Sequence, residues 1–194
     1  LVIPLKNGRV TSRIEALKSE LMRVKGVQAV TASSNMPGGQ FNQNSISLAE
    51  APNEHITTSE LFVDYDFMKT MKLELADGRF FTVADQQGTS TNFVINESAA
   101  RQLGTSVVGK EIHWHLYESD QPIVGRVIGV VKDFHFQSFH DPLRPLMMIS
   151  YPAYNHLVLK LNTGDFDASI AQVKKIYSQF DDSFEFEFAF LGER

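Results

Sequence analysis

The two ends of this chain carry the same structural pattern, and that repeat restricts the fold more than any other feature of the sequence. Residues 1–30 align without a gap on residues 157–186. Each copy opens with a short apolar run, breaks at a glycine and continues with apolar residues at helical spacing. The helical positions are Ile14, Leu17, Leu21 and Val24 in the first copy and Ile170, Val173 and Tyr177 in the second. A second strand-like run, "VQAVTAS" or "FEFEFAF", follows each helix, so each end predicts a βαβ unit.

Short local signals predict where the two helices begin and end. Ser12 and Glu15 have the spacing of a capping box, and Gly26 lies where the first helix would end. In the second unit either Asp165 or Asp167 can cap the helix.

Two adjacent βαβ units form a ferredoxin-like sandwich, in which helices cover one face of a four-stranded sheet. The alternative is a chance similarity between two generic βαβ segments. The sandwich places Leu1 and Arg194 at one edge of the sheet and sends the long connection out of the opposite edge. The sequence therefore predicts an α+β fold with a discontinuous terminal lobe, residues 1–40 plus 145–194, and an inserted lobe, residues 41–144.

Polar and proline-containing segments mark the two crossings between these lobes. Residues 32–45, "ASSNMPGGQFNQNS", are rich in Ser, Asn and Gly. Pro142 and Pro145 cannot both lie in a paired central strand, so they mark the return. We expect flexible joints near residues 36–45 and 141–146.

Between the crossings the sequence predicts a β-rich lobe with a few short helices. The predicted elements are a strand and short helix over 59–71, a strand over 92–96, a helix over 97–103, and a hairpin formed by 109–117 and 125–136. Asn96 is expected to cap the helix and Gly104 to end it.

Composition excludes several classes of function. The formal net charge is -5, from 23 acidic and 18 basic residues without a basic run, so no nucleic-acid partner is expected. The absence of cysteine excludes disulfides, thiolate metal sites and cysteine nucleophiles. No run approaches the roughly 18 apolar residues that a membrane helix needs. Because the chain begins inside an apolar run at Leu1, we expect a piece of a longer protein whose membrane segments lie outside these residues.

The first chemical candidate is a group of histidines around a carboxylate. Its members are Asp133, His135 and His140, together with His113 and His115. The predicted hairpin places His113 opposite a residue near 130 and leaves His135 roughly 13–17 Å further along, at about 3.4 Å per residue. Because this distance separates the two groups, no four-ligand metal site is expected.

The second candidate is a phosphate loop. Residues 104–111, "GTSVVGKE", have the spacing G-x-x-x-x-G-K. However, Glu111 follows Lys110 where a magnesium-binding Ser or Thr should stand, and the segment is expected to run from a helix into a strand. We therefore expect no nucleotide at this site.

Other catalytic patterns are equally weak. No G-x-S-x-G occurs, and the scattered carboxylates are expected in turns or at solvated edges. These carboxylates are Asp64, Asp66, Asp85, Asp181 and Asp182. Asn96-Glu97-Ser98 has the form of a glycosylation sequon, but Asn96 is better used as a helix cap. The sequence assigns no catalytic, cofactor-binding or metal-binding residue, and no enzymatic activity is expected.

Four motifs, taken together and in order, resemble those of a known family. They are "LADGRFFT", "FVINESAARQLG", "VVGKEI" and "VIGVVKDFHFQSFHDPLRPLMM". Over nearly the whole chain the sequence resembles the periplasmic core domain of MacB/FtsX-like ABC transporter permeases, most closely the large permeases of Bacteroidetes type. The resemblance implies a porter-like lobe built from both chain ends and a sabre-like lobe inserted between them.

The resemblance also implies a function. The domain would project into the periplasm from the bacterial inner membrane, between the first and second transmembrane helices of a dimeric permease. A separate cytoplasmic ATPase would drive motions that the domain transmits to a periplasmic partner or cargo, in efflux, export or lipoprotein handling. It implies no cofactor and no catalytic residue. Phe134 and Phe136 would then pack in the core while Asp133 and His135 face the other way.

Two further functions remain open at the level of sequence. The first is an extracytoplasmic ligand-binding or sensory module of the same topology, with a small molecule in the cleft between the lobes. Such a ligand would raise the melting temperature, because it binds only the folded state. The second, an enzyme, would require turnover by the isolated domain. We expect the isolated domain to be a monomer or a weak dimer.

Overall fold

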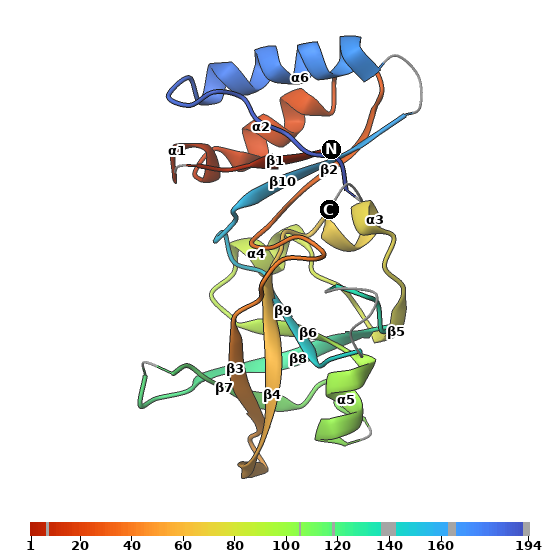
Figure 1. Ribbon diagram of the computed structural model, residues 1–194. Helices are drawn as coiled ribbons and strands as arrows, with labels where there is room; N and C mark the ends of the chain where they lie inside the picture. Colours follow the sequence, from red (N-terminus) through yellow and green to blue (C-terminus); the bar gives the residue numbers. More distant parts are fainter. Residues whose placement is uncertain (7, 105, 118, 137–142, 163–165, 192–194) are drawn as a thin grey trace.

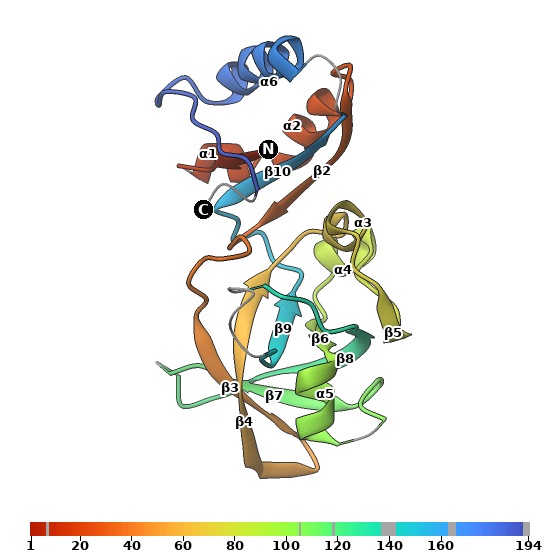
Figure 2. The same ribbon diagram turned by 45° about the vertical axis from the view of Figure 1, so that its right-hand side comes forward.

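The chain folds around two separate sheets, one made by its ends and one made by its middle. The computed structural model describes residues 1–6, 8–104, 106–117, 119–136, 143–162 and 166–191. A three-stranded sheet occupies one end of the molecule and a seven-stranded sheet the other (Figures 1 and 2). We call residues 1–33 and 156–191 the terminal lobe, and residues 43–149 the middle lobe.

The sheet of the terminal lobe is antiparallel throughout. Its order is β1 (Val2–Pro4), β10 (His156–Leu161) and β2 (Val27–Ser33). The helices of this lobe are α1 (Gly8–Thr11), α2 (Ile14–Leu21) and α6 (Phe166–Phe180). The apolar stripes predicted for α2 and α6 meet the sheet in one buried cluster, and α6 lies farthest from the middle lobe (Figure 1).

The predicted fourth strand of this sheet is wrong. Residues 184–190 contribute a single bridge, in which the amides of Val2 and Ala189 donate to each other's carbonyl oxygens at 2.8 and 2.9 Å. Two physical reasons account for the difference. The neighbouring strand β1 offers only three residues to pair with, and of the alternating phenylalanines Phe186 packs against the core while Phe184 and Phe188 stay 48% and 42% exposed. The two ends of the chain nevertheless lie side by side there, while Arg194 lies outside the described residues.

The capping box predicted for the first helix is also wrong. The Ser12 hydroxyl donates to the carbonyl of Arg9 at 2.9 Å and so belongs to the end of α1. Helix α2 begins at Ile14 without a side-chain cap. In the second unit Asp167 lies within the first turn of α6, and Asp165 lies outside the described residues.

The sheet of the middle lobe closes on itself. Its strands are β3 (Gln43–Leu48), β4 (Ala51–Phe62), β5 (Leu75–Gly78), β6 (Asn92–Asn96), β7 (Glu111–His115), β8 (Ile123–Val131) and β9 (Leu146–Ile149). The order β8-β6-β9-β4-β3-β7 returns to β8 through the β7–β8 pairing, while β5 joins the far half of β8. Six strands therefore form a closed barrel, which leaves few open edges.

Both faces of the central barrel strands are buried. Phe93 and Ile95 of β6 join an inner cluster that collects residues from all six barrel strands, whereas Val94 of the same strand faces an outer cluster. Helix α3 (Phe67–Met71) and the segment that precedes α4 (Val83–Gln87) cover the outer cluster. This double burial explains the uninterrupted apolar runs of β6 and β9.

The helix and the hairpin predicted within the middle lobe are confirmed. Helix α5 (Glu97–Leu103) starts where the Asn96 side chain accepts a hydrogen bond from the amide of Ala99 at 3.1 Å, and it ends at Gly104 with φ +103°. Strands β7 and β8 pair antiparallel as expected, but the register differs. His113 lies opposite Val124 rather than opposite a residue near 130.

The return crossing lies later in the chain than the expected boundary at residue 145. Strand β9 pairs in parallel with β4 and antiparallel with β6, which makes it part of the barrel. The chain therefore passes back to the terminal lobe over residues 150–155. Pro145 directly precedes β9, and its carbonyl accepts from the amide of Ser59 at 2.9 Å, whereas Pro142 lies outside the described residues.

Gly129 provides a test of how closely β8 packs against the end of β5. A Cβ atom added there would lie 2.1 Å from the carbonyl oxygen of Arg79. We expect Gly129→Ala to lower the free energy of unfolding by about 1–3 kcal/mol, as overpacking does elsewhere, measured by urea denaturation. Gly8→Ala is the matched control, because nothing lies within 4 Å of the added atom. Equal stability of the two variants would contradict the described packing.

Candidate functional site

The junction between the lobes is held first by backbone pairing. The end of β2 meets the end of β4, where Ser33 and Val63 form an antiparallel bridge. The amide of Ser34 donates to the carbonyl of Phe62 at 2.9 Å, and the amide of Asp64 donates to that of Ala32 at 3.2 Å. The sheet of one lobe is thereby joined to a barrel strand of the other.

A buried ion pair lies directly on this junction. Lys18 reaches out of α2 and places its Nζ 2.6 Å from Oδ2 of Asp64 and 2.9 Å from Oδ2 of Asp66. The side chains of Lys18 and Asp64 are 5% and 0% exposed. Asp64 also accepts hydrogen bonds from the hydroxyl of Thr31 and, at 2.9 Å, from the amide of Ala32. The carboxylate thus accepts hydrogen bonds from two elements of the terminal lobe, α2 and β2.

The ionisation of this cluster follows from its burial and its charges. Burial alone would lower the pKa of Lys18, but the carboxylates of Asp64 and Asp66 outweigh burial and raise it above its ordinary value. Burial raises the pKa of Asp64, and Lys18 opposes that shift. The same charges act on the Tyr154 phenol. Burial is the largest cause of the rise in its pKa, and the charges of Asp64 and Glu15 raise the pKa further.

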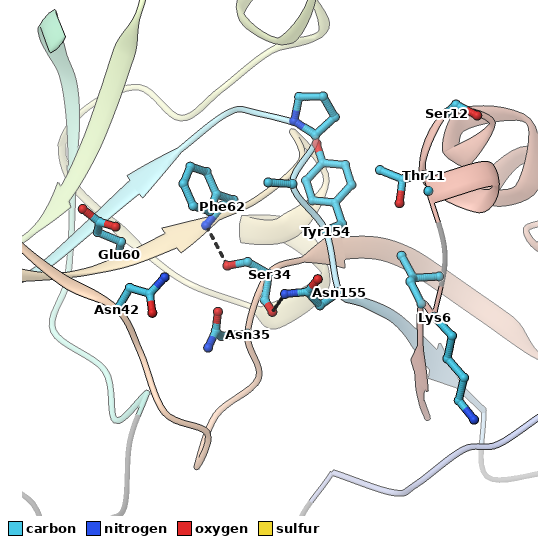
Figure 3. A pocket seen from close by; sticks show the side chains of 14 residues that line it. Lys6, Thr11, Ser12, Ser34, Asn35, Asn42, Glu60, Phe62, Tyr154 and Asn155 are labelled. Carbon is cyan, nitrogen blue, oxygen red and sulfur yellow. Dashed lines mark hydrogen bonds between the residues drawn. The ribbon is translucent and has the colours of Figure 1, made fainter. Parts of the chain in front are cut away.

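A cavity of about 770 Å³ opens beside the junction, between the two crossings and the end of the barrel (Figure 3). Its lining combines hydrogen-bonding side chains with a few apolar ones, including Lys6, Ser34, Asn42, Glu60, Phe62 and Tyr154. Residues from both lobes contribute, so the cavity exists only because the lobes are joined as they are.

Glu60 is the unusual residue of this cavity. It lies on β4 and is 4% exposed, two residues before Phe62, which packs against the inner cluster of the barrel. Its Oε1 accepts from the Asn44 amide at 2.8 Å and from the Trp114 indole N–H. Burial raises the pKa of the Glu60 carboxyl, and these two hydrogen bonds oppose the shift. A carboxyl group therefore stands at the end of an apolar barrel without a cation bonded to it in the described part of the chain.

The acid and histidine candidates from the sequence do not form one site. Asp133 accepts from the amide and hydroxyl of Ser98, both at 2.9 Å, and pairs with Arg101 at 2.6 Å, so it holds the start of α5. Phe136 is buried in the outer cluster and Phe134 packs against it, as expected, while His135 is exposed. His140 lies outside the described residues.

The other candidate histidines, His113 and His115, lie on β7, which pairs with the opposite end of β8 from Asp133. The rings of His55 and His113 lie 4.5 and 6.2 Å from the ring of His115, and the Ser47 hydroxyl lies 3.0 Å from Nε2 of His115. Burial, followed by the charges of His55 and His113, lowers the pKa of His115. Within the described ranges, no three His, Asp or Glu side chains are grouped so that they could hold a metal ion.

The remaining candidates from the sequence have roles in the structure as helix ends, helix caps or ion pairs. Gly104 ends α5 and Glu111 begins β7, so the candidate phosphate loop lies between a helix and a strand, as expected. Lys110 pairs with Glu50 at 2.7 Å. Of the carboxylates expected in turns or at solvated edges, three are buried instead: the side chains of Asp64 and Asp85 are 0% and 5% exposed, and Asp181 is 5% exposed. Asp85 instead forms a capping box with Thr82. Local patterns contain no signal for Lys18 or Glu60, because their partners come from distant segments.

The fold and its junction define a two-lobed α+β domain, and comparisons with known proteins show its family. Residues 4–176 match the family described as MacB-like periplasmic core domain. The chain therefore belongs to this family, whose members are the periplasmic domains of MacB-like ABC transporter permeases. Curated protein sequences contain no significant match.

Two solved structures show how far the fold likeness extends. The periplasmic region of MacB from Actinobacillus actinomycetemcomitans is 16% identical, with a TM-score of 0.63 over 92% of this chain and 82% of that one. The extracellular domain of the ABC-type transporter YknZ from Gram-positive bacteria is 18% identical, with a TM-score of 0.62 over 92% and 91%. The mixed α and β fold is thus that of MacB periplasmic domains. Among the described residues, no helix is long and apolar enough to cross a membrane.

The buried ion pair generates a stability prediction. Lys18→Met leaves the carboxylate of Asp64 buried without its cation, and we expect a loss of about 3–5 kcal/mol in the free energy of unfolding. Arg23→Met is the control, because Arg23 is 72% exposed and its ion pair among the described residues is with Glu20 on the surface. It should change stability by less than about 1 kcal/mol. Equal losses in urea denaturation would show that the Lys18 pair contributes nothing specific.

Glu60 generates a pH prediction. Its pKa is raised in the folded state, so its stabilising contribution is present below the ordinary value of 4.5 and is lost as the pH rises through the folded-state pKa. Glu60→Gln does not titrate. We therefore expect the melting temperature of the wild type to fall relative to that of Glu60→Gln as the pH is raised from about 4 to about 8. Parallel melting curves across this range would contradict the assignment.

Proposed function

We propose that this domain transmits force without catalysing a reaction. In this proposal it couples ATP hydrolysis by a cytoplasmic ABC ATPase to work in the periplasm, such as efflux, export or lipoprotein handling. Its partners are the transmembrane helices of its own permease, a second permease protomer and a periplasmic protein or cargo. It resides on the periplasmic side of the bacterial inner membrane.

The observation that carries this proposal is the construction of the lobe junction. A transmitted displacement must pass from the terminal lobe to the middle lobe without being absorbed between them. The buried pair of Lys18 and Asp64 and the bridge between Ser33 and Val63 both resist such absorption. These contacts favour a stiff connection over the flexible joints that the composition of the crossings predicts.

The position of the chain ends supports the same proposal. Val2 and Ala189 are hydrogen-bonded to each other, so segments leading to and from the domain can approach it together. Two membrane helices of one permease would require this arrangement. The terminal lobe then corresponds to the porter-like lobe near the membrane, and the middle lobe to the sabre-like lobe beyond it.

Spin labels on the full permease dimer test this proposal without knowledge of the cargo. This chain has no cysteine, so in a permease whose cysteines outside this chain are replaced by serine, Tyr117→Cys places one label on the middle lobe at a residue that is 98% exposed. Met22→Cys places a label on the terminal lobe at a residue that is 48% exposed. We expect the distance between protomers to differ between the nucleotide-free and ATP-bound states for both labels, because both lobes move as one body.

Two outcomes of this measurement would contradict the proposal. Unchanged distances for both labels would show that ATP binding does not move the domain. A change at the Met22 position alone would show that the junction absorbs the motion.

A further inference from the structure

The cavity beside the junction contains a buried carboxylate that is not paired with the cation in its lining. Two charged side chains line it, Lys6 and Glu60. Lys6 already has an anionic partner, because its Nζ lies 2.8 Å from Glu187. The two hydrogen-bond donors to Glu60, from Asn44 and Trp114, are both neutral. A buried carboxylate without a cation is unfavourable, so the cavity is best complemented by a positive charge.

The second carboxylate oxygen of Glu60, Oε2, is available to accept a hydrogen bond from such a cation. Both described hydrogen bonds to this carboxylate end on Oε1, and Oε2 accepts none from the described residues. The remaining wall suits an organic cation better than a metal ion. Glu60 is the one carboxylate among the described lining residues, whereas a bound metal ion requires several oxygen ligands.

The rest of the lining fits a ligand with polar groups and some apolar surface. Asn42 and Thr11 line the cavity, and no described hydrogen bond uses their side chains. Phe62 lies beside Glu60 in the cavity and gives it an aromatic wall (Figure 3). Ligand sites commonly lie at the mouths of β-barrels and combine apolar walls with a few fixed polar groups.

We propose that this cavity binds a ligand carrying a protonated amine, whose ammonium group donates to Oε2 of Glu60 while its apolar part lies against Phe62. The site is formed by both lobes, because Glu60 and Phe62 belong to β4 whereas Thr11 belongs to α1. Ligand binding therefore adds a contact across the junction. This inference does not depend on the proposed transmission of force, since a domain of any function could hold such a ligand.

Trp114 gives this proposal a specific reporter. It is the one tryptophan of the chain, and its indole N–H donates to the carboxylate of Glu60. A single indole cross-peak in a ¹H–¹⁵N NMR spectrum therefore reports on the environment of Glu60. An ammonium group that binds to Glu60 changes the hydrogen bond from Trp114 and shifts that cross-peak.

The test uses two matched probes, phenethylamine and its neutral N-acetyl derivative, on the whole chain. We expect millimolar phenethylamine to shift the Trp114 indole cross-peak in a saturable manner and the acetyl derivative to bind about tenfold more weakly or not at all. Glu60→Gln should weaken phenethylamine binding by about tenfold or more, because it removes the charge while preserving the shape. Glu50→Gln should leave binding unchanged, because it removes a charge whose partner is Lys110.

The proposal is overturned by any of three results. These are equal binding of the amine and the amide, no response to either probe, and binding to Glu60→Gln that equals binding to the wild type. If Glu60→Gln fails to fold, the comparison of the two probes on the wild-type chain still decides the matter.

Discussion

The ammonium group of Lys18 is the point at which the two halves of this molecule depend on each other. It comes from a helix of the terminal lobe and enters a group of oxygens supplied by the segment that follows β4. Removing these charges from water is costly, and such pairs often contribute more to the choice of one arrangement than to net stability. Here that choice is the orientation of a barrel relative to a sheet. The junction, the cavity and the proposed transmission of force all require it.

Glu60 has a different effect on stability, because its carboxylate has no cationic partner in the described part of the chain. The inner side of the barrel collects apolar residues from six strands, and a carboxylate at its end weakens the fold when it is ionised. Residues that reduce stability in this way are more common at functional sites than elsewhere. The contrast is informative because Asp64 and Glu60 lie four residues apart on the same stretch of chain. One carboxylate holds the lobes together, and the other faces a space large enough for a ligand.

The parts of the fold that the sequence predicts well are those whose signals are local. The helix over 97–103 is bounded by Asn96 and Gly104, two residues whose capping roles follow from backbone geometry alone. The repeated pattern at the chain ends likewise identifies three of the four expected strands. Residues 184–190 show the limit of this approach, because an alternating pattern forms a strand only where a neighbouring strand and a core receive it.

The candidate site was less predictable for the same reason. Asp64 looks like a residue of a polar turn until Lys18 and Thr31, both distant in sequence, surround it. Glu60 and Trp114 meet only because the barrel closes. The barrel itself could not be predicted from the sequence, because its closure needs the long-range pairings of β3 with β7 and of β4 with β9 as well as the local hairpin of β7 and β8. The register of that hairpin was also expected to be several residues different.

The way in which the chain leaves and re-enters the terminal sheet has an evolutionary consequence. Ser33 at the end of β2 lies opposite His156 at the start of β10, and the amide of Asn155 donates to the carbonyl of Ser33 at 3.0 Å. The whole barrel is thus inserted where two adjacent antiparallel strands would otherwise be joined by a tight turn. A lineage can lengthen, replace or delete an insertion at such a point while the strand pairing beneath it stays intact. The terminal lobe can therefore remain constant while the inserted middle lobe diversifies.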